Sequence, residues 1–235
     1  MTPGDPASHR RLRRLTLAIV VLNAFLAAIR TATYQQFFAM PGSSRFIVEL
    51  VIVLAIYFAG IFWITSTDDA ERGAALSVGT TFGLVTAALL IIHFAQENLI
   101  TLPPGRATEL FALFFIFAAL VLWGTAGYAT ARRGAPVSAG ATAGLRAAVV
   151  CMLVLVAGGL LLTFFSIPSP NYVLTWEEYQ ASGWSDAHAF GIANTFHSAF
   201  MHMIVGPILG GIVGALGWAI GRAIPRSAPL GTGSN

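Results

Sequence analysis

Six long apolar runs constrain the fold of this chain more than any other feature of its sequence. They cover residues 15–36, 46–66, 74–95, 108–130, 142–165 and 192–221. A helix of about 20 apolar residues crosses a bilayer whose hydrocarbon core is about 30 Å thick, whereas the strands of a membrane barrel alternate apolar and polar residues over short segments. The sequence therefore predicts an all-α integral membrane protein built as a bundle of six transmembrane helices.

The composition agrees with this prediction and excludes several functions. Charged residues make up 10% of the chain and hydrophobic residues 56%, so the apolar surface needs lipid to cover it. All 13 basic side chains are arginine, which excludes a lysine Schiff base, and the single cysteine, Cys151, excludes an intramolecular disulfide. The arginines form no stripe with interleaved aromatic residues, so nucleic acid is not an expected partner. The chain carries no nucleotide-binding loop and no serine–histidine–acid set, so we expect no catalytic residues.

The arginines predict the orientation of the helices, because cytoplasmic loops retain positive charge. With the N-terminus inside, the cytoplasmic ends carry Arg10, Arg11, Arg13, Arg14, Arg72, Arg132, Arg133, Arg222 and Arg226. The opposite loops carry only Arg45 and Arg106, with Arg30 near the outer end of the first helix. We therefore expect a bacterial-type cytoplasmic (inner) membrane protein with both termini cytoplasmic and the lipid bilayer as its first partner.

This orientation divides the chain into three parts. Residues 1–14 form a basic cytoplasmic segment, residues 15–222 the transmembrane domain, and residues 223–235 a flexible cytoplasmic tail. Four aromatic residues then fall near the inner interface, where such rings settle between headgroups and acyl chains; these are Trp63, Trp123, Tyr128 and Trp218.

An internal repeat is suggested by two fifteen-residue segments. "AERGAALSVGTTFGL" (70–84) and "ARRGAPVSAGATAGL" (131–145) agree at nine positions, and each lies at a predicted cytoplasmic turn between two spans. We interpret helices two and three, and helices four and five, as a duplicated helical hairpin of parallel repeats. Glycines spaced by four residues predict close helix packing; they are Gly79, Gly83, Gly140, Gly144, Gly206, Gly210 and Gly214.

The longest loop, residues 166–190, is predicted to lie outside and to hold a short surface helix near 176–182. Thr175 and Glu178 have the spacing of a capping box, and Ser185 with Asp186 could cap the sixth helix. Trp184 and its neighbouring aromatic residues would then face the lipid or the bundle.

Ionisable side chains gather in the outer half of the predicted bundle. Burying such a group in the membrane costs free energy, so each is expected to be paired or to have a function. His93 and Glu97 are four residues apart and share a helix face. Asn194, Ser198 and His202 share another face, whereas His197 and His202 point about 140° apart. We predict an ion or ligand pocket formed by His93, Glu97, Asn194, Ser198 and His202.

We predict structural roles for the remaining polar residues. Arg30 would balance Glu49 or Glu109, and His197 would bond near Asp186. Arg146 would extend to the inner interface. Interhelical polar contacts of this kind also occur without any functional site, so a purely structural role for the whole cluster stays open.

Gly206 and Pro207 mark a predicted kink in the sixth helix. Proline removes a backbone N–H and frees the carbonyl group one turn earlier, and kinked, glycine-flanked helices are used for gating or binding in transporters. A static kink filled by packing is the alternative.

Three functional hypotheses follow. The first is a non-enzymatic membrane protein of transport or ligand-binding type with a polar pocket on the outer side. The second is a structural or assembly subunit that joins other membrane subunits. The third is a redox protein that binds a metal ion or a b-type haem, with His93 and His202 as the axial pair; no compact metal-binding motif is present.

Overall fold

The computed structural model describes residues 6–64, 70–99 and 106–225, and every regular element within these ranges is a helix. The elements are α1 (Pro6–Thr33), the 3-10 helix η1 (Gln35–Ala39), α2 (Ser43–Ile64), α3 (Ala70–Leu99), α4 (Arg106–Arg132), α5 (Val137–Thr163), α6 (Pro170–Val173), α7 (Glu177–Ser182) and α8 (Ala187–Ala223). Six of the described helices are long and apolar enough to span a membrane, namely α1 to α5 and α8. The all-helical fold and the six candidate spans are thus confirmed.

The helix bounds differ from the predicted spans mainly at the ends. Helix α1 begins at Pro6, so part of the predicted basic segment is already helical. Helix α8 is 37 residues long and continues past both predicted ends of the last span. The predicted tail lies outside the described residues from position 226 onward.

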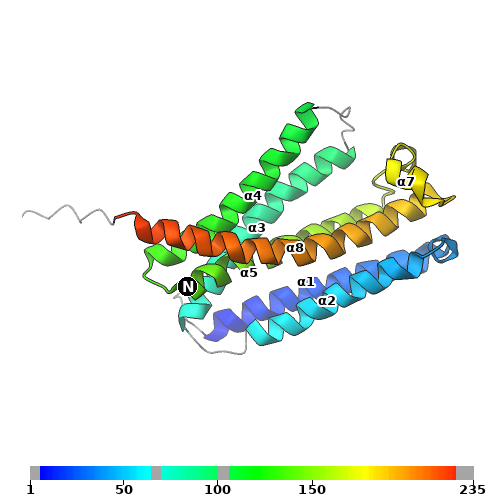
Figure 1. The fold of residues 1–235 in the computed structure, drawn as a ribbon. Helices are drawn as coiled ribbons and strands as arrows, with labels where there is room; N and C mark the ends of the chain where they lie inside the picture. Colours follow the sequence, from blue (N-terminus) through cyan, green and yellow to red (C-terminus); the bar gives the residue numbers. More distant parts are fainter. Residues whose placement is uncertain (1–5, 65–69, 100–105, 226–235) are drawn as a thin grey trace, which may run out of the picture.

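Helices α5 and α8 form the centre of the bundle and pack along each other. Helices α3 and α4 lie on one side of this pair and α1 and α2 on the other (Figure 1). Toward the end that carries α6 and α7, the α3–α4 pair diverges from α8 (Figure 1). We call this the open end, and the end with the α4–α5 turn at residues 133–136 the closed end.

Glycines hold the helices together toward the closed end. A Cβ added at Gly127 of α4 would lie 1.9 Å from the carbonyl oxygen of Gly214, and one at Gly144 of α5 would lie 2.2 Å from that of Gly210. Helix backbones can approach this closely only where neither residue has a side chain. The close packing predicted from the glycine spacing is confirmed, and Gly127 adds a contact that the spacing did not indicate.

The two predicted hairpins are not packed alike. Helices α4 and α5 contact each other, whereas the described parts of α2 and α3 scarcely touch. Helix α2 packs instead on α8 and α1, and the glycine face of α3 packs on α5, where Gly83 lies against Ala147. The duplication therefore stays a prediction.

The segment between α5 and α8 caps the open end. Helix α7 occupies the predicted position, and Asp186 caps α8 by accepting hydrogen bonds from the backbone N–H groups of His188 and Ala189. The predicted capping box is wrong, because Trp176 is the N-cap of α7 and the Thr175 hydroxyl donates to the carbonyl oxygen of Tyr172. Helices α6 and η1 were not predicted.

Three of the four predicted interface aromatic residues have described side chains. Trp218 and Tyr128 are half-buried near the closed end, and the indole of Trp218 donates to the carbonyl oxygen of Ala135 over 2.8 Å. Trp123 is only 3% exposed, so its prediction as an interface residue is wrong. The side chain of Trp63 lies outside the described residues.

Candidate functional site: a cleft between α3, α4, α5 and α8

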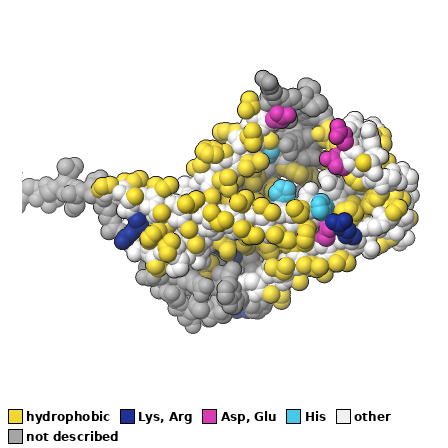
Figure 2. Space-filling view, viewed as in Figure 1, with side chains coloured by type: hydrophobic (Ala, Val, Ile, Leu, Met, Phe, Trp, Pro, Cys, Tyr) yellow, Lys and Arg dark blue, Asp and Glu magenta, His cyan; other side chains and the backbone are white. Residues whose placement is uncertain are grey.

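The divergence of the α3–α4 pair leaves a cleft of about 630 Å³ between these helices and the α5–α8 pair. Figure 2 shows the molecule hollowed there, with histidine side chains in the hollow. Apolar and aromatic side chains make up most of the lining. The polar lining residues are His93, Gln96, Trp123, Tyr172, Trp176, Asn194, Thr195, Ser198 and His202. The structure therefore brings four of the five predicted pocket residues to one cavity, and the side chain of the fifth, Glu97, lies outside the described part.

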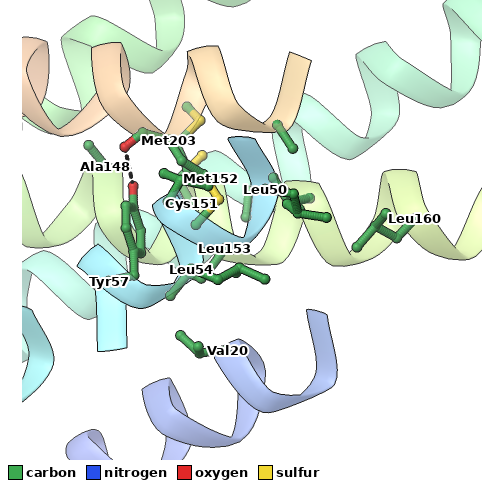
Figure 3. Packing of buried hydrophobic residues seen from close by; sticks show 14 of the residues in the cluster. Val20, Leu50, Leu54, Tyr57, Ala148, Cys151, Met152, Leu153, Leu160 and Met203 are labelled. Atoms are coloured by element: carbon green, nitrogen blue, oxygen red, sulfur yellow. Dashed lines mark hydrogen bonds between the residues drawn. The ribbon is translucent and has the colours of Figure 1, made fainter. Parts of the chain in front are cut away.

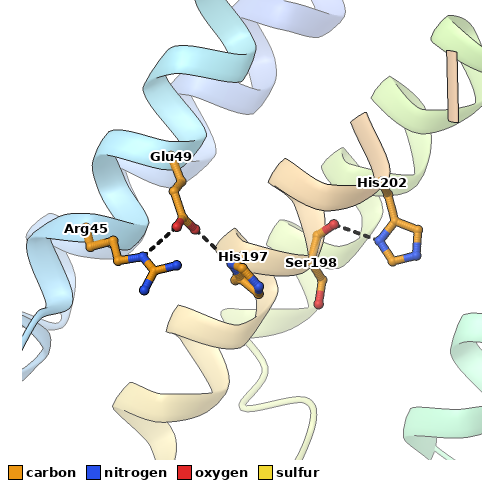
Figure 4. Close-up of polar contacts among 5 residues, drawn as sticks. All are labelled: Arg45, Glu49, His197, Ser198 and His202. Carbon is orange, nitrogen blue, oxygen red and sulfur yellow. Dashed lines mark hydrogen bonds and ion pairs between the residues drawn. The ribbon is translucent and has the colours of Figure 1, made fainter. Parts of the chain in front are cut away.

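Helix α8 supplies one polar wall of the cleft. Asn194, Ser198 and His202 are spaced by four residues, so the helix repeat stacks them on one face, as the sequence predicted. Nδ1 of His202 lies 2.7 Å from the carbonyl oxygen of Ser198 (Figure 4). Since a carbonyl oxygen only accepts, Nδ1 carries the proton and Nε2 is left with a lone pair in the neutral ring.

Helix α3 supplies His93 from the opposite side. Its half-buried ring stacks on Phe115 of α4, with centroids 4.7 Å apart and an interplanar angle of 10°. This contact holds the imidazole against the wall of the cleft. The predicted bond from His93 to Glu97 involves a side chain outside the described residues.

Trp123 of α4 is a lining residue that sequence reasoning missed. Its indole N–H is buried and has no hydrogen-bond acceptor among the described residues. Indole nitrogen is only a donor, and an unpaired buried donor costs about 1–3 kcal/mol. An indication of this burial was present in the sequence, because Trp123 falls within the predicted span 108–130 and not in a loop.

The described lining contains no carboxylate and no guanidinium group. The two histidines and Tyr172 are the ionisable residues of this described lining. The carboxylates and arginines of the predicted outer cluster lie elsewhere.

Glu49 belongs to a separate ion-paired cluster between α2 and α8. It accepts from Nε of Arg45 over 2.7 Å and lies 2.8 Å from Nδ1 of His197 (Figure 4). The predicted bonding of His197 near Asp186 is therefore wrong. Because α2 packs on the face of α8 turned away from the cleft, His197 meets Glu49 while His202 lines the cavity.

Arg30 is buried at the open end of α1 and contacts the side chain of His188. Its guanidinium also lies over the ring of Tyr34, 5.2 Å from the centroid. The predicted pairing with Glu49 or Glu109 is wrong. Glu109 is exposed on α4 and forms no ion pair with Arg30. His188 was missed in the sequence, although it follows the predicted cap residue Asp186.

The Tyr34 hydroxyl donates to a carboxylate oxygen of Asp186 over 2.7 Å and so joins α1 to the start of α8. Burial alone would raise the pKa of Asp186, but hydrogen bonds from the Ala189 and His188 backbones and from Tyr34 hold the pKa below its usual value. Burial, followed by the hydrogen bond to Asp186, raises the pKa of Tyr34 to about 12. Both shifts favour the state with a neutral tyrosine and an ionised aspartate.

Arg146 lies in the core near the closed end, 4% exposed, and donates to the hydroxyl groups of Thr80 and Thr16. Its predicted extension to the interface is wrong. Helices α1, α3 and α5 meet at this point, where the two threonine hydroxyls accept hydrogen bonds from the guanidinium. Asn23 was also missed; it is fully buried in α1 and donates to the carbonyl oxygen of Leu153 of α5 over 3.0 Å.

Pro207 lies within α8 without ending the helix. Its missing N–H leaves the carbonyl oxygen of Met203, four residues earlier, without its usual helical donor. The Tyr57 hydroxyl of α2 donates to this oxygen over 2.8 Å (Figure 3). The carbonyl freed by the proline is therefore satisfied by a protein side chain. Gly206, beside the proline, packs on Met152 of α5.

No three His, Cys, Asp or Glu side chains in the described ranges lie close enough together to hold a metal ion. No protein-family model matches this chain, and no curated protein and no solved structure matches it. The functional argument therefore depends on the geometry of the chain itself.

Proposed function

We propose that this chain is an integral membrane protein of transport or ligand-binding type, and that the cleft between α3, α4, α5 and α8 is its binding site. The observation that carries the proposal is the meeting of His93, Asn194, Ser198 and His202 at one cavity of about 630 Å³. Small-molecule sites commonly have volumes of about 300–1,000 Å³, mainly apolar walls and a few convergent polar groups.

The exposed surface supports placement in a bilayer. Leu110, Leu113, Phe114 and Phe117 of α4 are each at least 59% exposed, and α1, α2 and α8 also expose large apolar side chains. An apolar surface of this extent is unfavourable in water.

The arginines support an orientation with the closed end in the cytoplasm. Arg132 is the last residue of α4 and Arg133 follows it at that end, and Arg222 lies in the last turn of α8. The positive-inside rule then places the open end of the cleft on the outer side of a bacterial-type inner membrane, with both termini cytoplasmic. The sequence agreement between 70–84 and 131–145 supports an origin by duplication of a helical hairpin.

The cleft can be tested by filling it. Gly159 of α5 lines the cavity, and a Cβ there would meet its nearest neighbours, Phe94 and Thr195, at 3.7 and 3.8 Å. Gly159→Leu should therefore occupy the cleft without displacing the helix backbones. Gly158→Leu is the matched control, because Gly158 does not line the cavity and its Cβ would meet only Ile91, at 3.9 Å.

The measurement is native mass spectrometry of the gently solubilised protein and both variants. We expect a small molecule to be retained by the parent protein and by Gly158→Leu and to be absent from Gly159→Leu. Equal retention by all three proteins would overturn the proposal. An absorption spectrum of the same samples tests the redox alternative, since a Soret band would indicate haem in place of another ligand.

A further inference from the structure

We infer that the occupant of the cleft is an uncharged, single-chain lipid with an acceptor oxygen in its polar group, which Trp123 binds through its indole N–H. The inference rests on the proposed function and adds the chemical class of the ligand. Three observations carry it: the shape of the cleft, the charge of its described walls, and the indole N–H of Trp123, which has no acceptor among the described residues.

The cleft is elongated along the helices. Its lining on α8 runs from Asn194 to Leu209, fifteen residues further on, which is about 22 Å at 1.5 Å per residue. A chain-like ligand fits a volume of about 630 Å³ with this length better than a compact solute does.

The walls of the cleft disfavour a charged occupant. An isolated ion loses its hydration on entering an apolar site and needs an opposite charge or several hydrogen bonds to compensate. The described lining offers no carboxylate and no guanidinium, and most of it is aliphatic or aromatic. A neutral ligand avoids this desolvation cost, and its apolar chain gains from burial against side chains such as Leu155 and Val156.

Trp123 indicates what the ligand must offer. Its side chain lines the cleft while its N–H is fully buried without an acceptor among the described residues. An ester, ketone or ether oxygen would satisfy this donor without bringing a charge into the site.

The test uses three radiolabelled probes of the same chain length: 1-monooleoylglycerol, which is neutral and carries an ester oxygen; oleate at pH 9, which is anionic; and 1-octadecene, which has no polar group. Retention by the protein in phosphatidylcholine nanodiscs is compared with retention by empty nanodiscs. We expect saturable binding of monooleoylglycerol, with oleate and octadecene at least about tenfold weaker.

Trp123→Phe should weaken monooleoylglycerol binding by about three- to tenfold, the effect of losing one buried hydrogen bond, and should leave octadecene unchanged. Trp184→Phe is the matched control, because Trp184 does not line the cleft and its indole is not among the buried donors left without an acceptor in the described residues. A native circular dichroism spectrum and unfolding midpoint would show that each variant is folded.

The outcomes separate the two proposals. If Gly159→Leu binds monooleoylglycerol as well as the parent does, the cleft is not the binding site and both proposals are wrong. If Gly159→Leu abolishes binding, the cleft is retained as the binding site. The assigned ligand class is then wrong if oleate binds as tightly as monooleoylglycerol, or if Trp123→Phe has no selective effect.

Discussion

The hydroxyl of Tyr57 donates a 2.8 Å hydrogen bond to the carbonyl oxygen of Met203, the acceptor that Pro207 leaves without its helical N–H. Tyr57 is 7% exposed on α2, so the bond joins α2 to α8 in the core. A proline within a long helix thus creates the site at which a neighbouring helix is attached.

Tyr57→Phe should therefore destabilise the protein by about 1 kcal/mol, between the average for an interhelical hydrogen bond in a membrane protein and the cost of an unsatisfied buried acceptor. The measurement is the free energy of unfolding in mixed detergent micelles titrated with sodium dodecyl sulfate. In the Pro207→Ala background the alanine N–H can bond to Met203, so the loss should fall to about half. An equal loss in both backgrounds would show that the proline and the tyrosine are uncoupled.

Glycine contacts near the closed end should tolerate no added methyl group. Gly127→Ala should destabilise the fold by about 1–3 kcal/mol, because the new Cβ would lie 1.9 Å from the carbonyl oxygen of Gly214 and α4 and α8 would have to separate. Gly60→Ala is the control: a Cβ there meets nothing within 4 Å, and alanine is the better helix former. The same unfolding titration measures both, and a Gly127→Ala midpoint equal to that of Gly60→Ala would contradict the prediction.

The two histidines of α8 should differ in function because the helix turns them toward different neighbours. His202→Ala should lower the retention of the bound small molecule in native mass spectrometry, since His202 lines the cleft. His197→Ala should leave it unchanged, since His197 pairs with Glu49 on the other face of the helix. Equal losses in the two variants would indicate that His202 acts only through the fold.

Acid should weaken the junction of α1 and α8. The pKa of Asp186 is lower in the folded protein than in the unfolded chain, so its contribution to stability is complete above the unfolded value near 4 and is lost as the pH falls through the folded value. Unfolding midpoints between pH 6 and pH 2 should therefore decline, and the decline should be smaller for Asp186→Asn. A parallel decline in both proteins would assign the acid sensitivity to other groups.

Raising the pH should weaken the same junction through Tyr34, the hydrogen-bond partner of Asp186. Since the pKa of Tyr34 is raised to about 12, its contribution is complete below the unfolded value near 10 and is lost as the pH rises toward 12. Tyr34→Phe should remove the part of the alkaline decline that arises between these values in the same titration.

The orientation can be measured with cysteines, because the single native cysteine, Cys151, is fully buried. Ala181→Cys, exposed on α7, should react with a membrane-impermeant maleimide added outside intact cells, and Ser138→Cys, exposed at the start of α5, should react only after the membrane is opened. The reverse pattern would invert the proposed topology.

The helix-face predictions succeeded where only local geometry was involved. Asn194, Ser198 and His202 share a face because four residues complete about one turn of a helix, and His197 is turned away from them for the same reason. The pairing predictions failed because they required knowing which helices are neighbours. Glu49 meets His197 instead of Arg30 since α2 packs on α8, and Arg30 meets His188 at the open end.

The sequence by itself determined the class of fold, the six apolar helices and the faces on which their polar residues lie, because length, hydropathy and the helical repeat are local properties of the chain. Only the tertiary structure decided that α3 and α4 diverge from α8, that the buried indole N–H of Trp123 has no acceptor among the described residues, and that Tyr57 satisfies the carbonyl freed by Pro207. Each of these depends on contacts between residues far apart in the sequence. Where backbones meet at glycines toward one end and diverge at the other, a cleft results that no single helix encodes.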